Sequence, residues 1–150
     1  MCTEDGHPTR ILIADDHSLL RAAVRQLLEV QGGFDVVGEA ANAGETVILS
    51  RRLKPDIVLL DLSMPEESGL EVLAKLAKWP SIRVLLFTSA IENTELDEAF
   101  RLGARGVVLK HSTTTFLFDA IRAVMADDYW LKDRPVATLP LKWLNAKSGR

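Results

Sequence analysis

Asp61 follows directly on four apolar residues, within the sequence IVLLDLSMPEESG of residues 57–69. A short apolar run bounded by Pro55-Asp56 and Met64-Pro65 predicts a strand that is buried on both faces. Open α/β sheets bind their ligands at the carboxyl ends of their strands. Asp61 is therefore a candidate functional residue, although in isolation an acidic residue that merely ends a strand would look the same.

Polar side chains also follow three other predicted strands. They are Asp15 and Asp16 early in the chain, Thr88 in the middle, and Lys110 near the end of the pattern. Because the carboxyl ends of parallel strands meet at one edge, we expect these groups to lie around Asp61. Crowded carboxylates resist joint ionisation. Oxygen ligands suit a hard divalent cation, so the set as a whole predicts a Mg²⁺ site, although no single member is specific.

Five strand-like and five helix-like segments alternate along the chain and would position these groups. The predicted strands are 11–14, 34–38, 57–61, 82–87 and 106–109, and the predicted helices are 17–30, 43–53, 68–77, 92–102 and 113–126. Asn42 and Ser112 are the expected N-caps of the second and fifth helices. The alternation predicts one doubly wound α/β domain, a five-stranded parallel sheet with helices on both faces. Periodicity does not give the strand order, for which flavodoxin-like 2-1-3-4-5 is the natural choice.

Size and composition limit the possible domain organisation and partners of the chain. A chain of 150 residues predicts a single domain, and a formal net charge of −3 gives no bulk argument for nucleic acid or membrane binding. The single cysteine, Cys2, excludes a disulfide framework within the chain. We see no membrane-spanning apolar run and no secretory signal, and we expect a cytoplasmic protein.

The domain is expected to span residues 10–131, between a flexible N-terminus at 1–9 and a linker or C-terminal tail at 132–150. Pro135 and Pro140 interrupt any long helix in this tail. Yet Trp130, Leu139 and Trp143 belong to a stretch too apolar for a solvated linker.

The motifs together resemble the receiver domain of two-component response regulators, from about residue 10 to about residue 131. The matching segments are Asp15-Asp16 after ILIA, Asp61 in LLDLSMPEESGLEVL, Thr88 in VLLFTSA and Lys110 at the end of GARGVVLK. The segments DDH at 15–17, GARG at 103–106 and DDYWL at 127–131 are most similar to the LuxR/NarL-type subfamily. Members of that subfamily usually carry a helix-turn-helix output domain.

The resemblance implies that Asp61 accepts a phosphoryl group from a phosphohistidine of a sensor histidine kinase. It also implies four Mg²⁺ ligands, which are Asp15, Asp16, Asp61 and the backbone carbonyl of Ser63. Lys110 would pair with a phosphoryl oxygen, and Thr88 would turn its hydroxyl onto another oxygen and report the modification. Self-phosphorylation and self-dephosphorylation would be limited, so the product is a conformational state and the chain is not classed as an enzyme.

Two departures from the receiver pattern lie in and just after the predicted strand 106–109. Val107 stands where many receivers have Tyr or Phe, and His111 stands where many have proline, which leaves the geometry of the Lys110–His111 bond open. His17 follows the acidic pair, and we interpret it as the start of a helix, because Mg²⁺ prefers oxygen ligands.

Three further questions stay open at this point. The expected output is transcription, through a DNA-binding domain outside these 150 residues, and the alternative is a free-standing receiver that acts as a phosphorelay or protein-interaction module. A Mg²⁺-dependent phosphatase of the haloacid dehalogenase kind is a remote alternative, since the position of its second aspartate holds Ser63. Part of the last helix could serve a homodimer.

Overall fold

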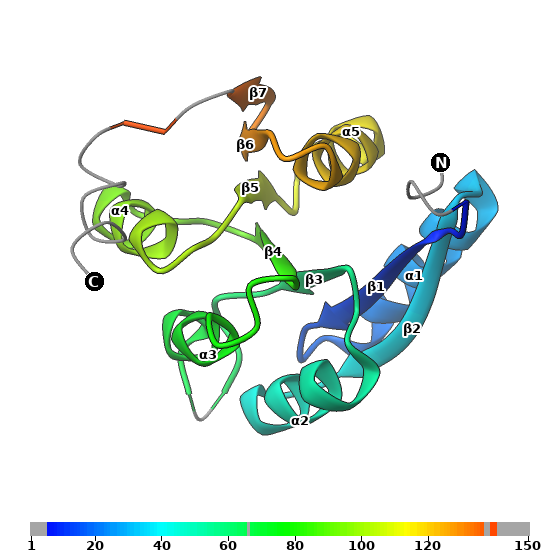
Figure 1. The fold of residues 1–150 in the computed structure, drawn as a ribbon, viewed down its shortest axis with the longest axis horizontal. Helices are drawn as coiled ribbons and strands as arrows, with labels where there is room; N and C mark the ends of the chain where they lie inside the picture. The colour runs from blue at the N-terminus through cyan, green and yellow to red at the C-terminus, as the bar shows by residue number, and fades with distance from the viewer. Residues whose placement is uncertain (1–5, 66, 137–138, 141–150) are drawn as a thin grey trace.

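The computed structural model describes residues 6–65, 67–136 and 139–140. Strands and helices alternate as predicted, and two short strands follow the last helix (Figure 1). The elements in chain order are β1 (Thr9–Ala14), α1 (Ser18–Gln31), β2 (Phe34–Ala40), α2 (Ala43–Leu53), β3 (Ile57–Leu60), α3 (Gly69–Leu76), β4 (Arg83–Thr88), α4 (Asn93–Arg101), β5 (Gly106–Leu109), α5 (Thr114–Met125), β6 (Tyr129–Leu131) and β7 (Arg134–Val136).

The strands of the described residues form one sheet, in the order β2-β1-β3-β4-β5-β6-β7. The predicted order 2-1-3-4-5 is confirmed, and the first five strands are parallel to their neighbours. The sheet is wider than predicted, because β6 adds in parallel to β5 and β7 returns antiparallel to β6. The expectation of five strands was therefore incomplete. Two three-residue strands carry little periodicity, and Pro135 is tolerated in β7 because that strand lies at the sheet edge.

The sheet extends past both predicted ends of the domain. Thr9, assigned to the flexible N-terminus, begins β1 and is buried. β7 and the buried residue Leu139 lie beyond the predicted end of the domain at residue 131. Cys2 and Trp143 lie outside the described residues.

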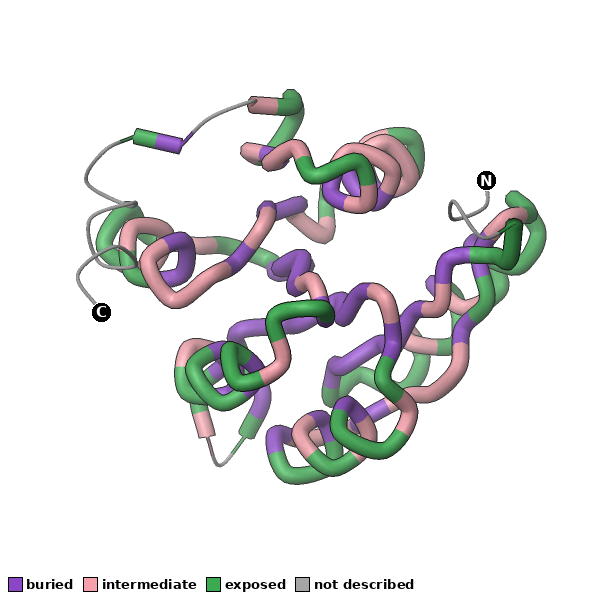
Figure 2. Tube along the Cα trace, viewed as in Figure 1, coloured by how far each residue is buried: buried purple, intermediate pink, exposed green. Residues whose placement is uncertain are grey.

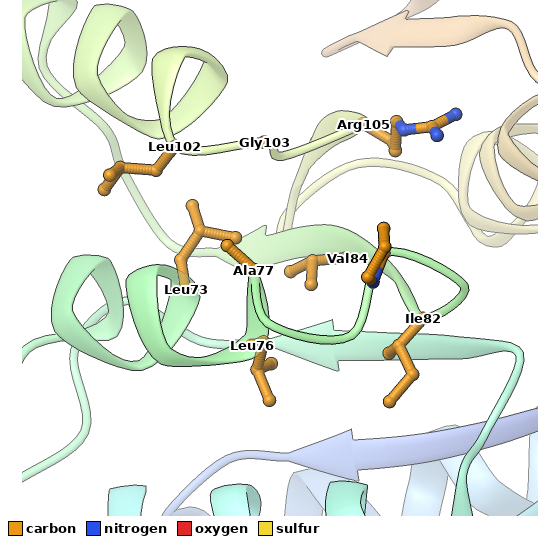
Figure 3. A pocket seen from close by; sticks show the side chains of 9 residues that line it. Leu73, Leu76, Ala77, Ile82, Val84, Leu102, Gly103 and Arg105 are labelled. Carbon is orange, nitrogen blue, oxygen red and sulfur yellow. The ribbon is translucent and has the colours of Figure 1, made fainter. Parts of the chain in front are cut away.

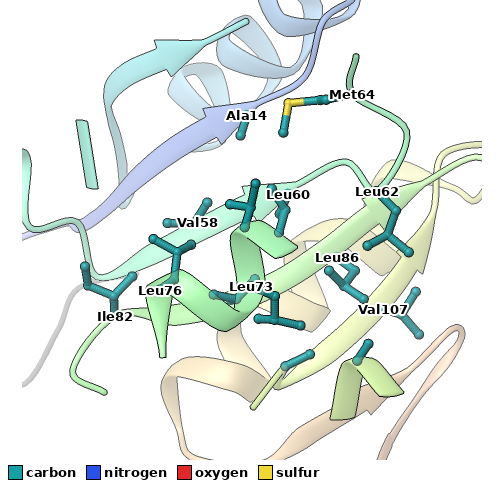
Figure 4. Packing of buried hydrophobic residues seen from close by; sticks show 14 of the residues in the cluster. Ala14, Val58, Leu60, Leu62, Met64, Leu73, Leu76, Ile82, Leu86 and Val107 are labelled. Carbon is teal, nitrogen blue, oxygen red and sulfur yellow. The ribbon is translucent and has the colours of Figure 1, made fainter. Parts of the chain in front are cut away.

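Two apolar layers hold the helices on the sheet. Helices α1 and α5 pack on one face around Val24, Leu28 and Ile121, and α2, α3 and α4 cover the other (Figure 1). Figure 2 shows the buried residues running along the strands and the inner faces of the helices. In the second layer Leu73 and Leu76 of α3 lie against the central strands (Figure 4). No helix in the described part of the chain is long and apolar enough to cross a membrane.

Helix caps follow the predicted chemistry, with one correction. Asn42 caps α2 as predicted, and its side chain accepts a hydrogen bond from the Glu45 amide at 2.9 Å. The cap of α5 is Thr113, whose hydroxyl accepts from the Phe116 amide, and the prediction of Ser112 was wrong. Ser112 instead donates its amide to the Leu109 carbonyl at 2.9 Å, in the turn that leaves β5. Ser and Thr are both favoured N-cap residues, and Ser ranks above Thr, so residue type alone pointed to Ser112.

Candidate functional site

The ends of four strands meet at one edge of the sheet, as predicted. β1 runs into Asp15, β3 into Asp61 and β5 into Lys110, and β4 ends at Thr88. Backbone hydrogen bonds tie these ends together. The Asp61 amide donates to the Ala14 carbonyl at 3.0 Å, and the Lys110 amide donates to the Thr88 carbonyl at 2.8 Å. The sheet ladder therefore continues into the site and fixes where each functional side chain leaves the backbone.

Lys110 bridges two buried carboxylates. Its Nζ lies 2.6 Å from Asp15 Oδ2 and 3.1 Å from Asp61 Oδ2. The exposed fractions of the side chains are 12% for Lys110, 3% for Asp15 and 1% for Asp61. Thr88 adds its hydroxyl, which donates to Asp61 Oδ1 at 3.4 Å. One ammonium group thus forms ion pairs with two carboxylates that are almost completely buried.

The ionisation of this pair follows from its contacts. Burial alone would raise the pKa of Asp15, but hydrogen bonds from Lys110 and from the His17 amide outweigh it, and the pKa is lowered. Burial alone would lower the pKa of Lys110, but its bonds to Asp15 and Asp61 outweigh it, and the pKa is raised. Both groups are therefore charged at neutral pH.

Asp16 completes an acidic cluster that opens to solvent. One ligand atom from each of Asp15, Asp16, Asp61 and His17 lies within 4.8 Å of the others. The Asp16 side chain is 33% exposed and the His17 side chain 65% exposed, so a cation can reach the buried carboxylates from their side. Three carboxylates face one ammonium group, and this excess of negative oxygen fits a hard divalent cation.

His17 takes part in the cluster more closely than the sequence suggested. It precedes α1 as its N-cap residue, which confirms that it starts a helix. Its Nδ1 also lies 3.0 Å from Asp15 Oδ1 and 3.3 Å from Asp16 Oδ1.

Arg21 was not identified from the sequence, and its Nη1 donates to the Asp15 carbonyl at 2.5 Å. Its position one turn further along α1 was the available signal.

The loop after Asp61 is held tightly against α3. The Ser63 amide donates to Asp61 Oδ1 at 3.1 Å, and the Gly69 amide donates to the Leu62 carbonyl at 3.1 Å. A Cβ atom on Gly69 would lie 2.5 Å from Leu62 Cα, so only glycine fits there. The ligand role predicted for the Ser63 carbonyl stays a prediction.

The two departures from the receiver pattern also have definite surroundings. Val107 is fully buried in β5 and pairs with Leu131 of β6. Its carbonyl accepts the Lys132 amide at 2.8 Å, so β6 lies directly along this part of β5. The Lys110–His111 peptide bond is trans.

A second hollow lies at the opposite edge of the sheet and offers no comparable chemistry. It is a cavity of about 130 Å³ between α3 and the start of β5, lined mainly by apolar side chains such as Leu73 and Ile82 (Figure 3). Its one charged residue, Arg105, lies over the Tyr129 ring and 3.6 Å from Asp127. The acidic edge is therefore the candidate functional site.

Comparisons with known proteins agree with this choice. A family model described as "Response regulator receiver domain" matches residues 11–122. The nitrate/nitrite response regulator protein NarL of Escherichia coli K12 is 36% identical over 146 residues, which cover 95% of this chain and 68% of NarL. The response regulator protein VraR of Staphylococcus aureus Mu3 is 35% identical over 114 residues, which cover 75% of this chain and 54% of VraR.

Solved structures show the same fold. A LuxR-family two-component response regulator from Aurantimonas sp. SI85-9A1 superposes with a TM-score of 0.78 at 34% identity, covering 95% of this chain and 98% of that one. The signal receiver domain of the putative response regulator NarL from Mycobacterium tuberculosis gives 0.75 at 33% identity, covering 80% and 98%. The chain spans little more than half the length of several curated relatives, for example 58% of the transcriptional regulatory protein YdfI of Bacillus subtilis.

Proposed function

Because the chain belongs to the response regulator receiver domain family, we propose that Asp61 accepts a phosphoryl group from a phosphohistidine of a sensor histidine kinase. The observation that carries the proposal is the position of the Asp61 carboxylate, between Lys110 at 3.1 Å and Thr88 at 3.4 Å, beside two further carboxylates. In the transfer, a carboxylate oxygen of Asp61 forms a bond to phosphorus while the bond from phosphorus to the imidazole nitrogen breaks. The histidine keeps that electron pair, and the product is an aspartyl phosphate.

Mg²⁺ is the proposed cofactor, held by Asp15, Asp16, Asp61 and the Ser63 carbonyl. When bound, it supplies positive charge against the phosphoryl oxygens, which is the main requirement of such transfers. The chain's own part is to keep two carboxylates buried and one partly exposed within reach of one another. Few protein ligands suffice, because Mg²⁺ usually keeps several waters.

Lys110 and Thr88 would change partners on phosphorylation. Lys110 holds Asp61 Oδ2 in the unmodified chain, and a phosphoryl oxygen on Asp61 would offer its ammonium group a stronger acceptor. The Thr88 hydroxyl lies 3.4 Å from both Asp61 Oδ1 and the Ala90 carbonyl, and at that distance its single proton makes only a weak hydrogen bond. It can therefore turn onto a phosphoryl oxygen at low cost, and the altered start of the β4–α4 connection would shift the population of states that a partner recognises.

An apolar surface beside the site supports a protein partner. Leu19 of α1 is a large apolar residue with an exposed fraction of 85%. With Leu20 and Ala23 it lines a shallow depression that Lys110 also reaches. We infer that the kinase domain carrying the phosphohistidine contacts this surface while its imidazole approaches Asp61. Exposed apolar side chains gathered at one place are typical of such interaction sites.

The proposed output is transcription, through a DNA-binding domain outside the present 150 residues. Support comes from the names of the relatives, which include a transcriptional regulatory protein and several response regulators. The receiver then spans residues 10–131, which end with β6, and residues 132–150 form the linker or tail, which begins with β7 of the same sheet. This chain alone is not expected to shift DNA in an electrophoretic assay at physiological salt, and a homodimer stays a prediction.

Intact-mass spectrometry tests the phosphoacceptor. The chain is incubated with acetyl phosphate and Mg²⁺, and its mass is expected to rise by one phosphoryl group. Asp61→Asn should abolish the rise, because an amide cannot form the acyl phosphate. Asp35→Asn, which changes an exposed acid on β2, is the matched control and should leave the rise intact. An undiminished rise in Asp61→Asn would refute the proposal.

A further inference from the structure

Arg21 joins α1 to both the acidic pair and the neighbouring strand. Its Nη1 donates to the Asp15 carbonyl at 2.5 Å, and its Nε donates to Glu39 Oε1 on β2 at 3.0 Å. The Arg21 side chain is only 15% exposed. The other oxygen of Glu39 accepts from Arg25 Nε at 2.8 Å, so the carboxylate that anchors Arg21 is itself held on its second side.

The group that Arg21 holds is the peptide that links Asp15 to Asp16. On the N-terminal side of Asp15, its amide donates to the Ala40 carbonyl at 2.9 Å. On the C-terminal side of Asp15, its carbonyl, which belongs to the linking peptide, accepts from Arg21. Both ends of the Asp15 main chain are thus tied to β2, one directly and the other through Arg21 and Glu39. The orientation of this peptide sets the direction in which the Asp16 side chain leaves the backbone.

We propose that Arg21 is a positioning residue, which together with Glu39 fixes the Asp15–Asp16 peptide so that Asp16 faces Asp61 and binds Mg²⁺. The inference rests on the proposed function, since it concerns the same metal site. Asp16 needs this help more than Asp15, because the Asp16 side chain is 33% exposed and that of Asp15 only 3%. A planar guanidinium can serve a carbonyl and a carboxylate at once, whereas the single nitrogen of lysine acts as a point charge.

Arg25 supplies a matched control within the same cluster. It binds the same carboxylate as Arg21 at a similar distance and lies one turn further along α1. Its other recorded ion pair is to Glu29, at 3.5 Å. A purely structural role for the arginine–glutamate cluster would make the two arginines equivalent. Positioning of the acidic pair would make only Arg21 matter at the metal site.

The first test needs no metal and uses the 150-residue chain. Loss of a hydrogen bond to the Asp15 carbonyl changes the polarisation of the peptide whose nitrogen belongs to Asp16. The ¹⁵N chemical shift of the Asp16 amide should therefore move upfield in Arg21→Met and stay in place in Arg25→Met. Equal movement in the two variants, or none in either, would overturn the inference.

The second test measures Mg²⁺ affinity by amide shift titration. Loss of a group that orients metal ligands typically weakens metal binding 10–100-fold, so we expect the Kd of Arg21→Met to rise about 10-fold and that of Arg25→Met less than 2-fold. Phosphorylation by acetyl phosphate should slow in Arg21→Met at limiting Mg²⁺ and recover at saturating Mg²⁺. Arg21→Lys, which keeps the charge, should fall between wild type and Arg21→Met, and it replaces Arg21→Met if that variant does not fold.

The outcomes separate this inference from the proposed function. If the wild-type chain bound no Mg²⁺, the proposed function would fail and the positioning role would fail with it. If the wild type bound Mg²⁺ and became phosphorylated while Arg21→Met bound Mg²⁺ equally well, only the positioning role would be refuted.

Discussion

Replacing Lys110 by methionine should strongly destabilise the metal-free protein. Lys110 is the cation that neutralises the buried carboxylates of Asp15 and Asp61, at 2.6 and 3.1 Å. Methionine fills a similar volume but leaves both carboxylates without a counter-charge. Breaking a buried ion pair by removing one partner costs about 3–5 kcal/mol, because the remaining charge has lost its compensation. We expect the free energy of unfolding to fall by that amount at neutral pH.

A second lysine provides the matched control. Lys75 lies 2.8 Å from Glu67, but the two side chains are 51% and 23% exposed. An exposed pair of this kind contributes about 0.2–1 kcal/mol. Lys75→Met therefore makes the same change of side chain with a similar ion-pair distance, but at a lysine that is more exposed and has one carboxylate partner instead of two buried ones. Urea unfolding at pH 7 with a chelator present measures both variants.

Added Mg²⁺ and pH extend the test. The variant has one positive charge fewer at the cluster, so Mg²⁺ should bind it more tightly and recover part of the lost stability. A ligand at 100 times its Kd contributes about 2.7 kcal/mol.

The pH dependence follows from the two shifted groups. Because the pKa of Asp15 is lowered in the folded chain, Asp15 stabilises the fold at pH values above the ordinary aspartate pKa, about 3.9. This stabilisation is lost as the pH falls through the lowered pKa. Because the pKa of Lys110 is raised in the folded chain, Lys110 stabilises the fold at pH values below the ordinary lysine pKa, about 10.4. This stabilisation is lost as the pH rises through the raised pKa. The gap between wild type and variant should therefore be widest near neutral pH.

A Lys110→Met chain that lost no more stability than Lys75→Met would refute this reasoning. The carboxylates would then be solvated well enough to stand alone, and the excess negative charge would no longer argue for a cation. A gap that kept its neutral value in acid would refute the assignment to Asp15 and Asp61.

Three further predictions concern the scaffold. Gly69→Ala would place a Cβ atom 2.5 Å from Leu62 Cα, so thermal unfolding should show a loss of about 1–3 kcal/mol, and unchanged stability would contradict the close approach. Phe100→Ala empties a fully buried site and should cost about 3–5 kcal/mol in urea unfolding, with a loss below 1 kcal/mol as the contrary result. Burial alone would raise the pKa of Glu39, but hydrogen bonds from its two arginine partners outweigh burial and lower the pKa. Glu39 therefore stabilises the fold at pH values above the ordinary glutamate pKa, and this stabilisation is lost as the pH falls through the lowered pKa. Glu39→Gln should be less stable than wild type at pH 7 and approach it in acid, and a gap that stayed constant through the acid range would contradict the assignment.

The sequence predicted which strand ends form the site, because each functional residue is marked by the strand immediately before it in the chain. Each functional group ends or directly follows a strand of four to six residues, apart from Asp16, which comes one residue later, and parallel strands bring such positions to one edge. Asp61, Asp15 and Lys110 were therefore found by residue type and position alone. The strand order came from the resemblance of the whole pattern to known folds and not from periodicity.

Other features depended on contacts that periodicity does not record. An apolar stripe on α1 marks a face of the helix but not what covers it, and the sequence pattern therefore gives no sign that Leu19 is 85% exposed. The β6–β7 hairpin consists of two strands of three residues each, too short for an alternating pattern. Its place beside β5 is seen in the pairing of Trp130 with Gly106 and of Leu131 with Val107.

Arg21 shows why the positioning of a site is harder to predict than its chemistry. The residue acts on a backbone carbonyl, and every residue has one, so the contact leaves no residue type to search for. Glu39, its anchor, lies on another element, and Arg25 on the same helix has the same charge and the same carboxylate partner. The 2.5 Å contact to the Asp15 carbonyl is what links Arg21 to the acidic pair. Residue types therefore identify which groups can hold a cation, whereas the side-chain contacts to the main chain determine whether those groups point at one another.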